Sequence, residues 1–195
     1  MIRMELKNEL NIIHQVLNGN TAAFRVLVDN YKHLVFSMVV KIVKNNEVAE
    51  EITQDSFLKA YHGLSTFKNE SKFSTWLFRI AYNTAVSKTR KKTIITSAID
   101  DYVIENFSIE AVQENLDEME EGEKLNFLNN AIADLNSDEQ LLINLFYFNQ
   151  QSVEEISTVT GLSDSNVKVR LHRIRKKMYA NMHSQMSKTQ VRKGI

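Results

Sequence analysis

Apolar residues recur at intervals of three and four along most of this chain, the spacing that places side chains on one face of an α-helix. Residues 21–92 carry this pattern almost without interruption. No segment alternates convincingly between apolar and polar residues, and the chain has no proline. The pattern predicts an all-α fold. The first three expected helices are one capped by Asn20, one capped by Asn46 that ends at Gly63, and one from about Ser74 to Lys92.

A second helical unit is expected to start near Leu125. The motifs SDEQ at Ser137 and SVEE at Ser152 are capping boxes, in which a hydroxyl and a side chain three residues later satisfy amide groups at a helix start. Gly161 then permits a short turn, and Ser163 caps a last helix. A helix, a short turn containing glycine and a second helix form the pattern of a helix-turn-helix.

The last helix has two different faces. Its apolar stripe is expected to pack against the rest of the unit and consists of Val167, Leu171, Ile174 and Met178. The basic residues around the stripe are Lys168, Arg170, Arg173, Arg175, Lys176 and Lys177. This combination predicts that the stripe fixes the helix to its domain while the opposite face enters the major groove of DNA.

The formal net charge is zero, but the charges are segregated along the chain. Residues 68–92 hold seven Lys or Arg and one acidic residue, residues 99–123 hold ten acidic residues and no basic one, and residues 161–195 hold nine basic residues and one acidic one. Blocks of this kind are typical of two modules that face a polyanion and are joined by an acidic connector.

Composition excludes several other classes of protein. The 195 residues are 43% hydrophobic and 25% charged, as in ordinary globular proteins. Because cysteine is absent and the five histidines have no ligand spacing, neither a metal nor another cofactor is expected. No apolar run approaches the roughly 18 residues of a membrane span, and Glu5 and Glu9 interrupt any signal-peptide core. The protein is therefore expected to be cytoplasmic.

Two stretches resemble the two domains of an extracytoplasmic-function (ECF) sigma factor of bacterial RNA polymerase. They are AFRVLVDNYKHLVFSMVVKIVKNNEVAEEITQDSFLKAYHGLSTFKNESKFSTWLFRIAYNTAVSKTRKK and AIADLNSDEQLLINLFYFNQQSVEEISTVTGLSDSNVKVRLHRIRKKM, in the order of the family. One departure is Asn136, where the family usually has a proline after the leucine. The expected organisation is a region 2 like domain over 1–92, an acidic linker over 93–124, a region 4 like helix-turn-helix domain over 125–184 and a basic tail over 185–195.

The resemblance implies a subunit that gives RNA polymerase its promoter specificity and takes part in opening the DNA, with no catalysis of its own. The implied partners are core RNA polymerase, promoter DNA as duplex and as melted single strand, and an anti-sigma factor. Two alternatives remain open. One is a helix-turn-helix regulator that acts without binding the polymerase clamp, and the other is a sigma-like decoy that sequesters an anti-sigma factor.

The basic helix is expected to read the minus-thirty-five element as duplex. Val169 is an apolar, β-branched residue on a basic face, where it can contact a thymine methyl group. Lys168 and Arg173 can donate to guanine or phosphate, and Asn166 can pair with adenine. Basic residues of this helix that lie off the base-facing side are better placed to contact phosphates. The full expected set is Asn166, Lys168, Val169, Arg170, His172, Arg173, Lys176 and Lys177.

Residues 67–92 are expected to bind the minus-ten element, because positive charge interleaved with an aromatic residue suits unpaired DNA. The loop FKNESKFS offers polar groups for hydrogen bonds to a base, and the resemblance places there the pocket for a flipped base. For Trp76, a role in core packing is an equal alternative. The expected set is Lys68, Asn69, Ser71, Lys72, Ser74, Trp76, Arg79, Asn83 and Arg90.

The second helix has a polar face with several carboxylates. An acid–base pair for catalysis is not expected there, because no nucleophile, histidine or glycine-rich loop accompanies the carboxylates. The resemblance instead implies that this face contacts the clamp helices of the polymerase. Its residues are Glu47, Glu51, Gln54 and Asp55.

Overall fold

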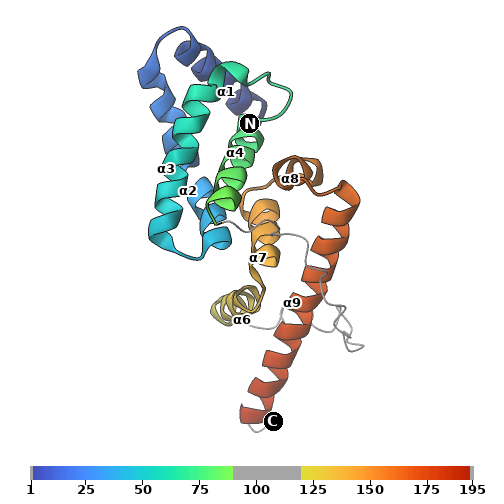
Figure 1. Ribbon diagram of the computed structural model, residues 1–195. Helices are drawn as coiled ribbons and strands as arrows, with labels where there is room; N and C mark the ends of the chain where they lie inside the picture. The colour runs from blue at the N-terminus through green and yellow to red at the C-terminus, as the bar shows by residue number, and fades with distance from the viewer. Residues whose placement is uncertain (1, 90–119, 194–195) are drawn as a thin grey trace.

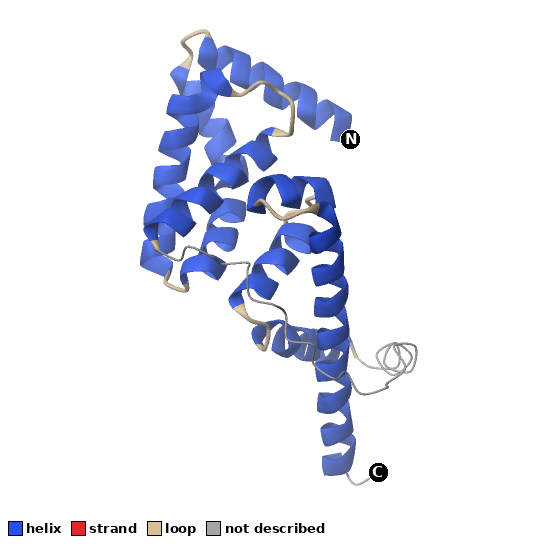
Figure 2. Ribbon diagram, turned by 45° about the vertical axis from the view of Figure 1, so that its right-hand side comes forward, coloured by secondary structure: helices blue, strands red, loops and turns tan. Residues whose placement is uncertain are grey.

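The computed structural model describes residues 2–89 and 120–193, and every regular element within those ranges is helical (Figure 1, Figure 2). The all-α prediction is confirmed. The N-terminal unit contains α1 (Ile2–Leu17), α2 (Phe24–Val43), α3 (Asn46–Gly63) and α4 (Phe73–Lys88). The C-terminal unit contains α6 (Glu121–Ala133), α7 (Ser137–Ile143), α8 (Val153–Thr160) and α9 (Asp164–Lys193). Shorter helical turns are η1 (Thr21–Ala23), η2 (Leu64–Thr66) and η3 (Asn144–Phe148).

The N-terminal unit is a bundle in which α2, α3 and α4 pack against one another. Leu27 of α2, Ile52 of α3 and Leu77 of α4 have no exposed surface. Each such side chain stabilises the fold by roughly 1.5–3 kcal/mol relative to an exposed one. Helix α1 packs against α2 and contributes Ile13 and Val16 to the same core.

The C-terminal unit has the predicted helix-turn-helix. The capping box that starts α8 is present, because Ser152 Oγ accepts from the Glu155 amide while the Glu155 carboxylate accepts from the Ser152 amide. Gly161 ends α8 at φ +78°, a left-handed conformation that glycine adopts without strain. Helix α9 follows, and its first turn is capped by Ser163, whose Oγ accepts from the Asn166 amide at 3.3 Å.

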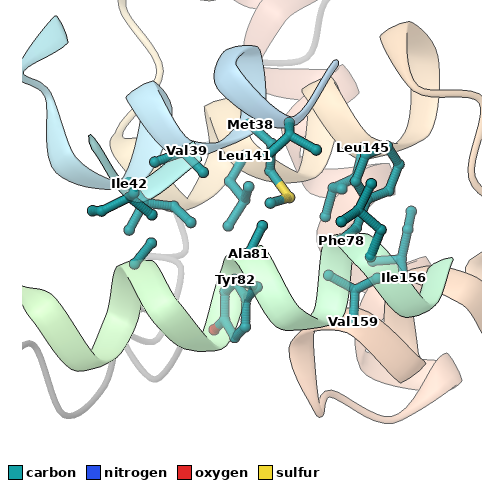
Figure 3. Close-up of a cluster of buried hydrophobic side chains, with 14 of the residues drawn as sticks. Met38, Val39, Ile42, Phe78, Ala81, Tyr82, Leu141, Leu145, Ile156 and Val159 are labelled. Atoms are coloured by element: carbon teal, nitrogen blue, oxygen red, sulfur yellow. The ribbon is translucent and has the colours of Figure 1, made fainter. Parts of the chain in front are cut away.

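The two units share one hydrophobic core, an arrangement on which the sequence analysis made no prediction. Helix α4 packs against α8, and α2 packs against α7. Phe78 of α4, Leu145 of η3 and Ile156 of α8 are fully buried together, and Met38 and Val39 of α2 approach Leu141 of α7 (Figure 3). The apolar sides of α2 and α4 therefore serve both units at once.

Polar contacts cross the same boundary. Thr75 Oγ1 donates to Gln151 Oε1 at 3.1 Å, and both side chains are buried. Asn144 Nδ2 donates to Ser37 Oγ at 3.3 Å. Because a buried polar group costs free energy unless it is paired, these bonds favour one relative position of the two units over others.

Three of the expected helix caps are wrong in detail. The cap of α3 is Asn45, whose side chain accepts from the Val48 amide at 2.9 Å, and Asn46 is already inside the helix. Gly63 is the last residue of α3 at φ −89°, so it does not supply a left-handed cap. Asn20 precedes η1 and makes no capping hydrogen bond with its side chain.

The capping box of α7 is shifted by one residue from the expected motif. Asn136 accepts from the Glu139 amide at 2.9 Å, and Glu139 Oε2 accepts from the Asn136 amide at 2.8 Å. Ser137 is the first helical residue. Gln140 instead donates to the carbonyl of Leu135 at 2.9 Å. Asparagine and serine are comparable caps, so the sequence alone did not separate the two registers.

The ends of the expected linker and tail are helical where they are described. Helix α6 starts at Glu121, so the last four residues expected in the linker belong to a helix, while residues 93–119 lie outside the described residues. Helix α9 continues through residues 185–193 without a break. Among the described helices, none is both long and apolar enough to cross a membrane.

Candidate nucleic-acid interface

The outer face of α9 carries the predicted mixture of cations and one apolar side chain. Lys168, His172 and Arg173 are exposed, and Val169 exposes 47% of its surface between them. Lys176 is half-buried. The opposite side holds the apolar stripe as predicted, with Val167, Leu171 and Ile174 buried and Met178 partly buried.

Arg170 does not lie on the surface as the sequence analysis expected. It exposes only 8% of its surface, and its Nε donates to Asn166 Oδ1 at 2.6 Å. This hydrogen bond uses the side-chain oxygen of Asn166, and the Arg170 guanidinium is packed against the rest of the unit. Arg170 is thus better placed to stiffen the start of α9 than to contact a phosphate.

Lys177 is also held inside the C-terminal unit. Its Nζ lies 2.8 Å from Glu139 Oε2 and 3.2 Å from Oε1. The Glu139 side chain is 3% exposed and is the acidic partner in the capping box of α7. Because a buried carboxylate needs a compensating charge or hydrogen bonds, the structure gives Lys177 an internal role that its off-face position in α9 did not reveal.

On α4, the predicted DNA face is only partly available. Lys72, Arg79 and Asn83 are exposed, as are Lys68 and Asn69 of the preceding loop. Ser74, in contrast, is 8% exposed on the packed side of the helix, so it cannot reach a base, and Ser71 is half-buried. Arg90 lies outside the described residues.

Trp76 belongs to a cluster of aromatic side chains beside this face. Its ring centroid lies 5.4 Å from that of Phe67 and 5.8 Å from that of Phe73, both in tilted geometry. Its indole also covers Gly63, where a Cβ would lie 3.7 Å from the ring. Since Trp76 is half-buried, one part of the ring packs and another part remains accessible.

A cavity of about 230 Å³ opens beside the predicted minus-ten loop. Its walls come from two places in the chain. One side is the loop before α4, formed by Asn69, Glu70, Ser71 and Lys72 with Phe67 and Phe73 at its ends. The other side is α1, which contributes Glu9, Leu10 and Ile13. Asn69 adopts φ +59°, a left-handed conformation that asparagine tolerates. The contribution of α1 escaped the sequence analysis, because α1 is separated from the loop by two helices.

An ion pair joins the loop before α4 to the helix-turn-helix unit. Lys72 Nζ lies 3.0 Å from Glu155 Oε1, and Glu155 is the acidic partner in the capping box of α8. One of the cations expected at the minus-ten element is therefore held by the helix-turn-helix unit in this arrangement.

The pKa values of Glu154 in the helix-turn-helix and of Tyr82 in the core are shifted by their surroundings. A hydrogen bond from Ser152 lowers the pKa of Glu154 on α8, and the charge of Lys168 lowers it further, so this carboxylate stays ionised beside the cations of α9. Burial raises the pKa of Tyr82, which lies in the core shared by the two units, and the nearby charge of Asp138 adds to the shift.

The polar face of α3 is exposed as predicted. Glu47, Glu51 and Gln54 are exposed, Asp55 is half-buried, and Glu51 forms an ion pair with Lys88 of α4. Leu58 is an additional residue of this face that was not predicted; it exposes 57% of its surface and lies one turn beyond Gln54 and Asp55. The signal in the sequence was a leucine three residues after Asp55 and four after Gln54, which is the spacing of neighbours on one helix face.

A second apolar surface that the sequence analysis missed lies between α6, η3 and α9. It is a groove of about 460 Å³ lined by residues that include Leu128, Tyr147, Phe148 and Met182. Phe148 exposes 60% of its surface and Tyr147 exposes 48%. Exposed apolar surface of this kind is typical of a contact with another molecule. The run FYF at the end of an apolar helix was the signal in the sequence.

Comparison with known families finds two matches on the two helical units. The family model for Sigma-70 region 2 matches residues 27–94, and that for Sigma-70 region 4 matches residues 128–178. The first match contains α3, α4 and the loop between them. The second contains the helix-turn-helix and the exposed face of α9.

Among curated proteins, the chain is similar to the ECF RNA polymerase sigma-E factor of Escherichia coli strain K12, with 33% identity over 174 residues that cover 84% of this chain and 88% of that protein. It is also 28% identical over 177 residues to the ECF RNA polymerase sigma factor SigW of Bacillus subtilis strain 168, covering 83% and 89% of the two chains.

Two solved structures share the fold. One is CnrH in complex with the cytosolic domain of CnrY, with a TM-score of 0.60, 22% identity and coverage of 89% of this chain and 96% of that one. The other is the sigma factor RpoE in complex with the anti-sigma factor NepR from Bartonella quintana, with a TM-score of 0.57, 19% identity and coverage of 82% and 96%.

Proposed function

Because the chain belongs to the extracytoplasmic-function (ECF) family of RNA polymerase sigma factors, we propose that its two helical units read two promoter elements in two different states of the DNA. A sigma factor is a regulatory subunit that directs RNA polymerase to promoters, and it is not an enzyme. The proposal assigns the chain no catalytic activity and no cofactor of its own. The protein acts in the cytoplasm, where the polymerase and its promoters are.

The exposed face of α9 reads the minus-thirty-five element as duplex DNA. The observation that carries this assignment is Val169, an apolar side chain exposed among cations on a helix whose other side is buried. A solvated basic face gains nothing from a valine, whereas a thymine methyl group in the major groove offers it an apolar contact. Lys168, His172 and Arg173 flank it for bases or phosphates, with Lys176 further along the face.

The loop before α4 and the exposed face of α4 bind the minus-ten element as single strand. Lys68, Lys72 and Arg79 follow the phosphates, while the accessible part of Trp76 stacks on a base. The cavity beside the loop receives a base that has left the duplex stack. Lys72 must leave Glu155 to reach DNA, so engagement of the minus-ten element competes with the contact between the units.

The exposed face of α3 contacts the clamp of core RNA polymerase. Its carboxylates complement basic residues on a partner, and Leu58 adds an apolar contact at the centre of the interface. An anti-sigma factor is a further proposed partner, by analogy with RpoE, whose solved structure contains one.

Transcription with purified core polymerase tests this function. Addition of the chain is expected to produce initiation at specific sites on a genomic template, and core polymerase alone is expected to produce none. A helix-turn-helix regulator without clamp binding would bind duplex DNA but would not associate with core polymerase. A decoy would bind an anti-sigma factor without supporting any initiation. Either result would overturn the proposal.

A further inference from the structure

The cavity beside the minus-ten loop is closed on one side by α1, which precedes the residues matched by the family model for region 2. Glu9, Leu10 and Ile13 form this wall. At about 230 Å³ the cavity is smaller than the roughly 300–1,000 Å³ of pockets for drug-sized ligands, and it suits one planar group with the size of a base. Residues of α1 therefore help to shape the space in which a base would lie.

Glu9 is the polar side chain of this wall. The Tyr31 hydroxyl of α2 donates to Glu9 Oε1, and Glu9 is half-buried. The Tyr31 ring is itself held in place, because its centroid lies 5.7 Å from that of Phe73 at the start of α4. The carboxylate thus has a defined position at the cavity, supported by two helices. Glu70, the other carboxylate at the cavity, is exposed on the loop and lacks this support.

An ionised carboxylate accepts hydrogen bonds and donates none. Cytosine, adenine and guanine each carry an exocyclic amino group that can donate to it. Thymine has no amino group, and carbonyl oxygens flank its single ring N–H. A carbonyl oxygen opposite a carboxylate is repelled, so a fixed carboxylate in a base pocket rejects thymine as well as favouring the other bases.

We propose that Glu9 is a specificity-determining residue of the minus-ten pocket: its carboxylate accepts a hydrogen bond from the exocyclic amino group of the flipped base and thereby selects against thymine. This inference rests on the proposed function, in which the loop before α4 receives an unpaired base. Tyr31 acts as a positioning residue, since its hydroxyl fixes the carboxylate without touching the base.

The test uses holoenzyme reconstituted from core polymerase and the full-length chain. The upstream duplex is first selected by wild-type holoenzyme from a randomised pool and is then held fixed. The templates are premelted over the minus-ten region, the unpaired non-template strand is randomised, and the bound templates are sequenced. Wild-type holoenzyme is expected to deplete thymine at one unpaired position.

In Glu9→Gln, the amide can donate to a thymine carbonyl. Thymine at that single position is therefore expected to rise by roughly five- to tenfold relative to wild type, while the other positions keep their profile. Tyr31→Phe keeps the ring and removes the hydroxyl, and it is expected to reduce the discrimination in part. Glu121→Gln removes an exposed carboxylate from α6, away from the proposed DNA and clamp surfaces, and serves as the matched control, with an unchanged profile.

Three results would overturn the proposal in distinguishable ways. If wild type shows a base preference that Glu9→Gln leaves unchanged, the assignment to Glu9 is wrong while the base pocket stands. If Glu70→Gln changes the preference and Glu9→Gln does not, the loop carboxylate has the role. If wild type shows no preference at any unpaired position, the proposed base pocket itself fails. Thermal melts of each variant ensure that the profiles come from folded proteins.

Discussion

Thr75 of α4 and Gln151, just before α8, are 76 residues apart in the sequence, yet the threonine hydroxyl donates to the glutamine side-chain oxygen at 3.1 Å in a buried position. Gln151 Nε2 in turn donates to the carbonyl of Asn149 at 3.2 Å. The bond starts from a residue one helical turn before Phe78, a side chain that is buried with Leu145 and Ile156 (Figure 3). It therefore reports directly on whether the two units are docked.

A double-mutant cycle measures this docking in solution. Thr75→Val and Gln151→Leu are each expected to lower the free energy of unfolding by about 1–3 kcal/mol, because each leaves a buried polar group without its partner. The double variant should lose less than the sum of the two, since both groups become apolar. Chemical denaturation of the four proteins gives the coupling. A coupling of zero would mean that the two units do not form this contact in solution.

Lys177 and Lys168 provide a matched pair of lysines on one helix with different roles. Lys177→Met is expected to lower the free energy of unfolding by about 1–3 kcal/mol, because Glu139 loses its charged partner in a buried position. Lys168→Met should leave stability nearly unchanged, because Lys168 is exposed, and should reduce the slope of log affinity against log salt by about one unit. Melting curves and duplex binding at several salt concentrations distinguish them. The reverse pattern would place Lys177 at the DNA.

Asn69 permits a test of base capture that keeps the backbone unchanged. Asn69→Gly removes the whole side chain, including its amide, and glycine adopts the left-handed conformation at φ +59° without strain. We expect promoter binding to persist while the open complex falls about fivefold, the equivalent of one hydrogen bond. Permanganate reactivity of unpaired thymines measures opening. A premelted template should restore part of the loss, and an equal defect on duplex and premelted templates would argue against a role in opening.

A substitution at Leu58 tests the proposed clamp-binding face of α3. Leu58→Ser is expected to weaken binding to core polymerase by about tenfold, because the serine removes an apolar contact near the centre of the proposed interface. The free protein should melt as before, since the leucine is already 57% exposed. Leu17→Ser, at a leucine that is 47% exposed elsewhere on the surface, is the control. Equal affinity of both variants for core polymerase would remove Leu58 from the interface.

Much of the fold followed from side-chain spacing. The 3.6-residue period of an α-helix assigns each residue to a face, so the buried positions of Val167, Leu171 and Ile174 and the exposure of Val169 were predictable from position alone. The helix-turn-helix was predictable for a related reason. Ser152 and Gly161 act within a few residues of their own position, where the local backbone decides the conformation.

The roles of charged residues were less predictable, because a charge can bind DNA or a partner within the protein. Arg170 and Lys177 are of the residue types that commonly contact phosphates. In the structure, however, Arg170 donates to Asn166 and Lys177 donates to Glu139. Glu139 lies 38 residues before Lys177, and only the packing of α7 against α9 brings them together. Glu9 lies at the loop before α4 in the same way, through the position of α1.

The sequence by itself determined the helical class, the two units and the faces of their helices, because these properties depend on neighbours within one or two turns. Only the tertiary structure decided that the two units share a core and that Lys72 pairs with Glu155. Periodicity shows that Phe78 is buried, but an apolar surface has no intrinsic preference among partners. Its partners, Leu145 and Ile156, are set by the shape and hydrogen bonding of the whole assembly.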